Sequence, residues 1–72
     1  MKYSITFTNA FKRDLKIAKK QHKNLEKLFF VIEKIANGDT LPPTLKDHAL
    51  TGNYKDTREC HIEPDWLLIY QI

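Results

Sequence analysis

Side chains able to carry out acid–base chemistry are concentrated between residues 46 and 66 of this chain. Two of its three histidines, His48 and His61, lie there with the carboxylates Glu59 and Asp65. Residues two apart on a strand point the same way, so Glu59 and His61 would share one face. Asp65 follows the end of that strand, and His48 arrives from the preceding loop or strand. A hairpin could therefore bring two imidazoles and two carboxylates together.

Such a set suits metal-free proton transfer on a polyanion. Cleavage of RNA by its own 2′-hydroxyl needs a base for that hydroxyl, an acid for the leaving oxygen and positive charge beside the phosphorane. Histidine fits the first two roles because its pKa lies near neutrality. Either His61 or Asp65 could take the 2′-proton, and the sequence does not choose between them. Zinc on His48, His61 and Asp65 would have acceptable ligands but no matching motif, so we predict no metal and no cofactor.

Positive charge gathers on an amphipathic helix predicted from Ala10 to about Lys23. Its apolar stripe is spaced by 4, 3 and 4 residues, as Phe11, Leu15, Ala18 and His22. The opposite arc carries six cations, namely Lys12, Arg13, Lys16, Lys19, Lys20 and Lys23. A solvated face is the ordinary reading of such an arc. Only one acid, Asp14, lies nearby, and cationic patches attract phosphate of any sequence, so we expect this arc to contact the phosphates of a nucleic acid.

The secondary structure around these residues is predicted from the periodicity of the apolar residues and from the residues that begin or end helices. Residues 2–8 alternate polar and apolar and predict a half-buried strand, after which Thr8 or Asn9 would cap the first helix. A second helix is predicted from about Asn24 to Ala36, with Asn37-Gly38 as its stop. The short link between the two helices predicts an antiparallel helical hairpin.

The second half of the chain predicts strands. Asp39 to Lys46 contains two prolines and indicates an extended loop. Thr57 to Glu63 alternates and indicates a strand, and Pro64-Asp65 indicates a turn. Trp66 to Ile72 is apolar on both faces, which predicts an interior strand with a neighbour on each side. We therefore expect an α+β fold, with a helical hairpin packed on a small antiparallel sheet.

Size and composition narrow the class of protein. A chain of 72 residues supports one domain, so we predict a single domain over residues 1–72. The chain has twelve Lys and Arg and nine Asp and Glu, which gives a mild surplus of positive charge. The longest apolar run, Trp66 to Tyr70, is far below the roughly 20 residues of a membrane span, so we expect no membrane partner. The N-terminus has no signal-peptide core, and the lone Cys60, expected to be buried, fits a reducing cytoplasm.

Two motifs in the second half carry a family resemblance. The first is Lys46-Asp-His-Ala-Leu-Thr-Gly-Asn-Tyr-Lys55, and the second is Arg58-Glu-Cys-His-Ile-Glu-Pro-Asp-Trp-Leu-Leu-Ile-Tyr70. Together they resemble the YafQ branch of the RelE/ParE toxin superfamily, in which "DHxLxGxW/YK" precedes "R-acid-x-H-(I/V)-(E/K)-P-D-W". The predicted strand and basic hairpin before them match as well, so the resemblance covers the whole chain.

The resemblance implies a ribosome-dependent mRNA endonuclease, the metal-free toxin of a type II toxin–antitoxin pair, checked by its antitoxin. His48, His61 and Asp65 match family catalytic residues, Glu59 an active-site acid, and Trp66 an aromatic at the site. We also expect contacts with RNA from the cations around these motifs, Lys46, Lys55 and Arg58.

The chain also departs from the family pattern. Members continue past the position of Ile72 through a further strand with an Arg-Thr-Gly-(Ser/Thr)-His motif and a terminal Leu-Phe. We therefore expect an incomplete catalytic set and an open edge on the strand from Trp66 to Ile72. That edge would recruit a second copy or an antitoxin segment. The rival functions are a shortened, non-catalytic module that binds antitoxin or ribosome, and a relative acting on DNA gyrase.

Overall fold

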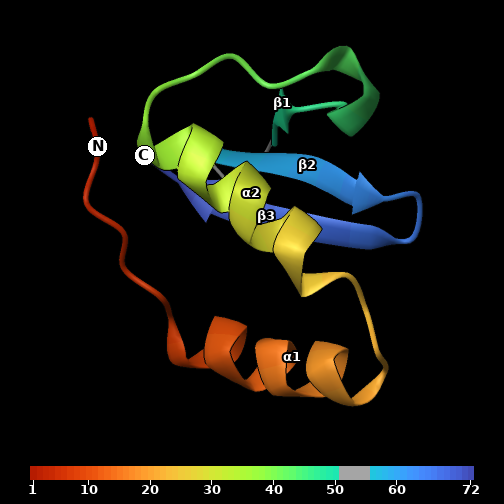
Figure 1. Cartoon of the computed structure of the whole chain (residues 1–72). Helices are drawn as coiled ribbons and strands as arrows, with labels where there is room; N and C mark the ends of the chain where they lie inside the picture. Colours follow the sequence, from red (N-terminus) through yellow and green to blue (C-terminus); the bar gives the residue numbers. More distant parts are fainter. Residues whose placement is uncertain (51–55) are drawn as a thin grey trace. The chain divides into compact units, whose positions relative to one another are not determined.

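A computed structural model of the chain describes residues 1–50 and 56–72, in two compact units, Met1–Gly38 and Asp39–Ile72. The first unit holds the helices α1 (Asn9–Lys20) and α2 (Leu25–Ala36) (Figure 1). The second holds a short 3₁₀ helix, η1 (Pro43–Leu45), and a three-stranded antiparallel sheet of β1 (His48–Ala49), β2 (Thr57–Glu63) and β3 (Trp66–Gln71). The α+β class is confirmed. No described helix is long and apolar enough to cross a membrane.

Both helices begin at side-chain caps. The Thr8 Oγ1 accepts a hydrogen bond from the backbone N–H of Phe11 at 3.0 Å, and the Asn24 Oδ1 accepts one from Lys27 at 3.1 Å. Each cap satisfies a first-turn N–H that has no partner inside the helix. Thr8 is therefore the cap of α1, and α2 begins one residue later than predicted because Asn24 caps it.

Both helices end at a residue in the left-handed conformation. His22 has φ 57°, its N–H donates to the Lys19 carbonyl at 3.1 Å, and the next N–H donates to Ala18 at 3.0 Å. These two bonds form a Schellman motif, and they end α1 before the predicted Lys23. Gly38 has φ 76° and closes α2 as predicted, with its N–H bonded to the Ile35 carbonyl at 3.0 Å.

The predicted N-terminal strand over residues 2–8 is wrong. The segment is extended but forms no strand among the described residues. Its Tyr3 N–H donates to the Ala36 carbonyl at 2.8 Å, at the end of α2, and Ile5 and Phe7 remain exposed. An alternating pattern assigns side chains to two faces, but a strand also needs a neighbouring ladder of backbone groups. That neighbour lay outside what the pattern could specify.

The sheet has the order β1-β2-β3, with β2 in the centre. On one face, Cys60 pairs with Leu68, and both are buried with Ile62. On the other face, Leu67 and Ile69 are exposed. The prediction of β3 as an interior strand is therefore wrong for the described part of the chain, where it has one neighbour and one buried face. We predicted burial of both faces because both carry apolar residues, but an apolar residue type does not by itself show that the side chain is buried.

The predicted loop from Asp39 to Lys46 contains a turn of 3₁₀ helix. Pro43 begins η1, where its fixed φ favours the helical start, and Leu45 is buried. Lys46 then takes the left-handed conformation, φ 50° and ψ 43°, and its N–H donates to the Pro43 carbonyl at 3.0 Å.

The two left-handed helix ends predict opposite responses to substitution. His22→Gly is expected to stabilise the fold by about 1 kcal/mol, because glycine avoids the steric cost that a side chain meets there. Gly38→Ala is expected to destabilise it by about 1–2 kcal/mol. An added Cβ at Gly38 would also lie 2.7 Å from the Lys2 Cδ. Urea unfolding of both variants tests the pair, and two shifts of the same sign would contradict this account.

Candidate active site

The centre of the site is a contact between β1 and β2. His48 lies directly across from Glu59 in the antiparallel register. The His48 Nε2 is 3.1 Å from the Glu59 Oε2, with the imidazole about half exposed and the carboxylate mostly covered. Because β1 is only two residues long, a single cross-strand pair brings the histidine to the carboxylate.

The other nitrogen of His48 is held by the backbone. Its Nδ1 is 2.7 Å from the Lys46 carbonyl oxygen, which the left-handed conformation of Lys46 turns toward the ring. A carbonyl only accepts, so we assign the proton of this contact to Nδ1. Glu59 also accepts, so both contacts are hydrogen bonds only when the ring is doubly protonated. That is the form from which an acid delivers a proton.

His61 completes a group of three. It lies two residues beyond Glu59 on β2, on the same face, and its ring centroid is 6.3 Å from that of His48, with the planes tilted by 40°. The cross-strand partners of Glu59 and His61 on β3 are Ile69 and Leu67, both exposed. Of the two imidazoles and two carboxylates predicted to meet, His48, His61 and Glu59 lie together on one face of the sheet, beside an apolar row.

The remaining predicted site residues lie around this group. Asp65 is exposed in the turn between β2 and β3, and Trp66 is half-buried at the start of β3. The structure places both at the turn end of the sheet, beyond His61 along β2. Lys46 is exposed beside His48. Lys55 lies outside the described residues.

Arg58, which we predict to contact RNA, has a carboxylate neighbour within the chain. Its Nε and Nη2 donate to the two carboxylate oxygens of Asp47, at 3.3 and 3.1 Å. The Tyr70 hydroxyl donates to the same carboxylate at 2.6 Å. Burial and this hydrogen bond raise the pKa of Tyr70 to about 12. Sequence reasoning missed this cluster, because Asp47 lies just before β1, Tyr70 is on β3, and no local spacing connects them.

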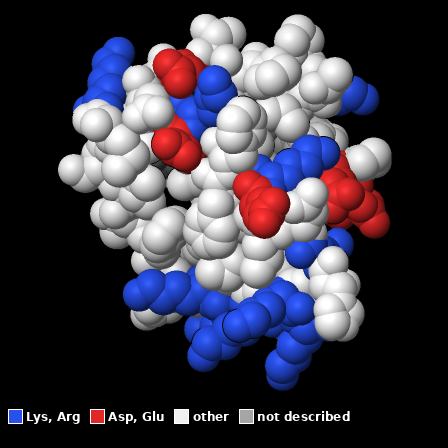
Figure 2. Space-filling model, in the orientation of Figure 1, with Lys and Arg blue, Asp and Glu red and all other residues white. Residues whose placement is uncertain are grey.

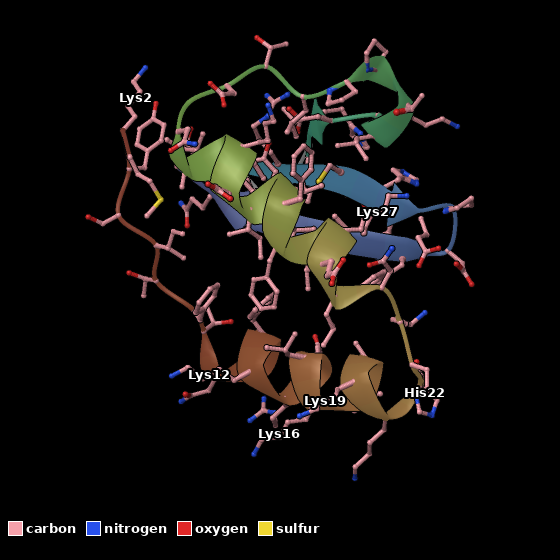
Figure 3. The ribbon with its side chains drawn as sticks, in the orientation of Figure 1. Lys2, Lys12, Lys16, Lys19, His22 and Lys27 are labelled. Atoms are coloured by element: carbon pink, nitrogen blue, oxygen red, sulfur yellow. The ribbon has the colours of Figure 1, made fainter. Side chains whose placement is uncertain are left out.

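The predicted cations cover α1. Lys12, Arg13, Lys16, Lys19 and Lys20 are all exposed, whereas Lys23 follows the helix and is half-buried. Figure 2 shows Lys and Arg side chains crowded over this helix, and Figure 3 shows Lys12, Lys16 and Lys19 along it. The last turn also places Lys19 and Lys20 at the negative end of the helix dipole, a favourable position for cations.

Histidine and carboxylate are ligand types that transition metals accept. Across residues 1–50 and 56–72, however, no three His, Cys, Asp or Glu side chains converge on a point that could hold a metal ion.

The chain thus combines a small antiparallel sheet, which brings two imidazoles and a carboxylate together on one face, with a cationic helix in its other unit. Comparison with known proteins gives the family. The model for the bacterial toxin of type II toxin–antitoxin systems, YafQ, matches residues 3–72. The chain is 39% identical over 69 residues to the mRNA interferase toxin YafQ of Escherichia coli K12, covering 94% of this chain and 75% of the relative. The chain therefore belongs to the YafQ toxin family.

Solved structures agree with this assignment. The Escherichia coli DinJ–YafQ toxin–antitoxin complex matches with a TM-score of 0.92 and 37% identity, covering 100% of this chain and 80% of that one. A metal-bound toxin from Helicobacter pylori matches with a TM-score of 0.85 and 46% identity, covering 90% and 72%.

Cys60, on the strand that carries the site, is fully buried, as predicted. Burial, and then the charge of Asp47, raise the pKa of its thiol to about 11. At about pH 8 the thiolate fraction is then about 100-fold below that of an ordinary thiol. We expect iodoacetamide to label the native protein at least about 100-fold more slowly than the urea-unfolded chain. Equal rates in the two states, followed by mass spectrometry, would contradict a buried thiol.

Proposed function

We propose that this protein is an endoribonuclease that cleaves mRNA on the ribosome by acid–base chemistry. The observation that supports it best is the group of His48, Glu59 and His61 on one sheet face, with the imidazole centroids 6.3 Å apart. In-line attack of the 2′-oxygen puts the attacking and leaving oxygens on opposite sides of phosphorus. Two separate proton carriers are then needed, and two adjacent imidazoles supply them.

The contacts of His48 suggest how the roles divide. When doubly protonated, its ring donates to the Lys46 carbonyl and to Glu59, so it suits the acid that protonates the leaving 5′-oxygen. His61, on the same face, would then take the 2′-proton. Asp65 is the other candidate base that the sequence left open, but it lies in the exposed turn, farther along from the His48–Glu59 pair. Glu59 would orient the His48 ring.

We propose the ribosome as the place of cleavage because the cationic arc and the candidate catalytic histidines belong to different units of the chain. The exposed cations of α1 belong to the unit Met1–Gly38, and the histidines to the unit Asp39–Ile72. A cationic helix supplies phosphate attraction without sequence preference, which suits docking on ribosomal RNA. Lys46 and Trp66, beside the histidines, would contact the mRNA. This substrate also places the toxin in the cytoplasm.

The proposed protein partner is an antitoxin, as in the DinJ–YafQ complexes. In the described part of the chain the outer edge of β3 has no neighbouring strand. An extended antitoxin segment could add a strand there, because an open edge presents unpaired N–H and C=O groups. A second copy of the chain is the other occupant that this edge would accept.

Removing either imidazole is expected to abolish most cleavage. His48→Ala and His61→Ala should each lower the rate about 10²–10⁴-fold, the usual contribution of a general acid or base. The measurement is primer extension on mRNA from translating ribosomes incubated with each variant. His22→Asn is the matched control: it alters the third histidine, at the end of α1, and asparagine tolerates its left-handed conformation.

The same experiment separates the enzyme from a binding module. New mRNA ends that appear with the wild-type protein and His22→Asn, and vanish with His61→Ala, support the nuclease. Co-sedimentation with ribosomes while the mRNA stays intact would instead identify a non-catalytic module.

Neutralising cations on α1 is expected to weaken ribosome binding uniformly. Lys12→Gln with Lys16→Gln should reduce the slope of log affinity against log salt by about 1 for each lysine that contacts a phosphate. The control is Lys27→Gln with Lys34→Gln, which removes the same charge from α2. Equal slopes for the two double variants, measured by ribosome pelleting over a salt series, would remove α1 as the docking surface.

A further inference from the structure

The carboxylate of Asp47 accepts three hydrogen bonds, from the side chains of Arg58 and Tyr70. Arg58 gives it two N–H groups from β2, and Tyr70 gives it a hydroxyl from β3. The carboxylate is mostly covered, with 23% of the side chain exposed. Charge-assisted bonds of this two-pronged kind are stronger and more directional than neutral ones. The residue just before β1 is thereby tied to both other strands of the sheet.

Among the described residues, β1 has only a short backbone ladder besides its contact with this cluster. β1 is two residues long, pairing His48 with Glu59 and Ala49 with Arg58. One further backbone bond follows, from the Leu50 N–H to the Thr57 carbonyl at 2.9 Å. Before β1, Lys46 takes the left-handed conformation, which is unfavourable for a residue other than glycine. A short ladder next to an unfavourable backbone conformation has a weakly determined position.

Alternation along the chain couples this cluster to the candidate site. Asp47 lies just before β1, and His48 begins it. Their partners on β2, Arg58 and Glu59, are consecutive, so the two contacts fall on opposite faces of that strand. Movement of Asp47 on one face therefore moves His48 on the other.

We propose that Asp47 is a positioning residue for the reaction, whose bonds to Arg58 and Tyr70 fix β1 so that His48 stands against Glu59. The inference rests on the proposed nuclease function. Asp47 does not face the reacting atoms in this scheme, and it acts only through His48. Misplacing a reacting group by about 1 Å can cost about 100-fold in rate, so a small loosening of β1 would be measurable.

The kinetic test uses Asp47→Asn, which keeps the shape but removes the charge and one acceptor. We expect kcat for mRNA cleavage to fall about 10–100-fold, with ribosome affinity and the unfolding midpoint close to wild type. In a His48→Ala background the same substitution should have no further effect on kcat, because its target is gone. A general structural role would instead lower kcat by the same factor in both backgrounds, and would overturn the proposal.

Tyr70→Phe provides a milder second variant, because it removes one hydrogen bond and leaves the Asp47–Arg58 pair. We expect a smaller loss of kcat that also vanishes in the His48→Ala background. Tyr3→Phe is the matched control, since it removes a tyrosine hydroxyl from the other unit and should change neither kcat nor affinity. This variant keeps the test decisive if Asp47→Asn does not fold.

A spectroscopic test does not depend on cleavage. The ¹⁵N shifts of the His48 ring should report a protonated Nδ1 in the wild type, held by the Lys46 carbonyl, and an average of both tautomers in Asp47→Asn. His61, on the neighbouring strand, should keep its wild-type signals. If the wild type cleaves no mRNA but shows this change, the nuclease proposal fails and the positioning role stands. If the His48 signals are the same in both proteins, the positioning role fails.

Discussion

Side-chain alternation along β2 is the constraint on which the rest of the second unit depends. One face of the strand carries Cys60 and Ile62, which are buried, and the other carries Glu59 and His61. A slip of one residue would exchange the two faces, exposing the core and burying a carboxylate and an imidazole without partners. The burial of the apolar face therefore fixes the face on which Glu59 and His61 lie. The strands β1 and β3 take their register from the same strand.

The two faces are also linked in their polar contacts. Asp47, just before β1, contacts Arg58 on one face of β2, and His48, the first residue of β1, contacts Glu59 on the other. Two consecutive residues thus reach β2 from opposite faces. In the helical unit, the capping residues determine where the helices begin and end, and the exposed arc of α1 carries the positive charge. The candidate site residues and the cationic arc of α1 therefore belong to different units of the chain.

Sequence reasoning succeeded where structure is set by neighbours in the chain. Thr8 and Gly38 act within one helical turn, and the alternation of β2 lies within a single strand, so each could be predicted. It failed where a distant partner decides. Residues 2–8 alternate like a strand but have no ladder, and the bond between Asp47 and Tyr70 joins residues that no spacing rule connects. The meeting of His48 with His61 was predictable only because a hairpin has few geometries.

The enclosed Cys60 has a practical consequence for work on this protein. It is the only cysteine in the sequence, and its sulfur lies inside the sheet. A cysteine introduced on the cationic arc of α1 would therefore be the single accessible thiol, without any need to replace the native one. Fluorophores or spin labels could then follow docking and antitoxin release in an otherwise natural chain.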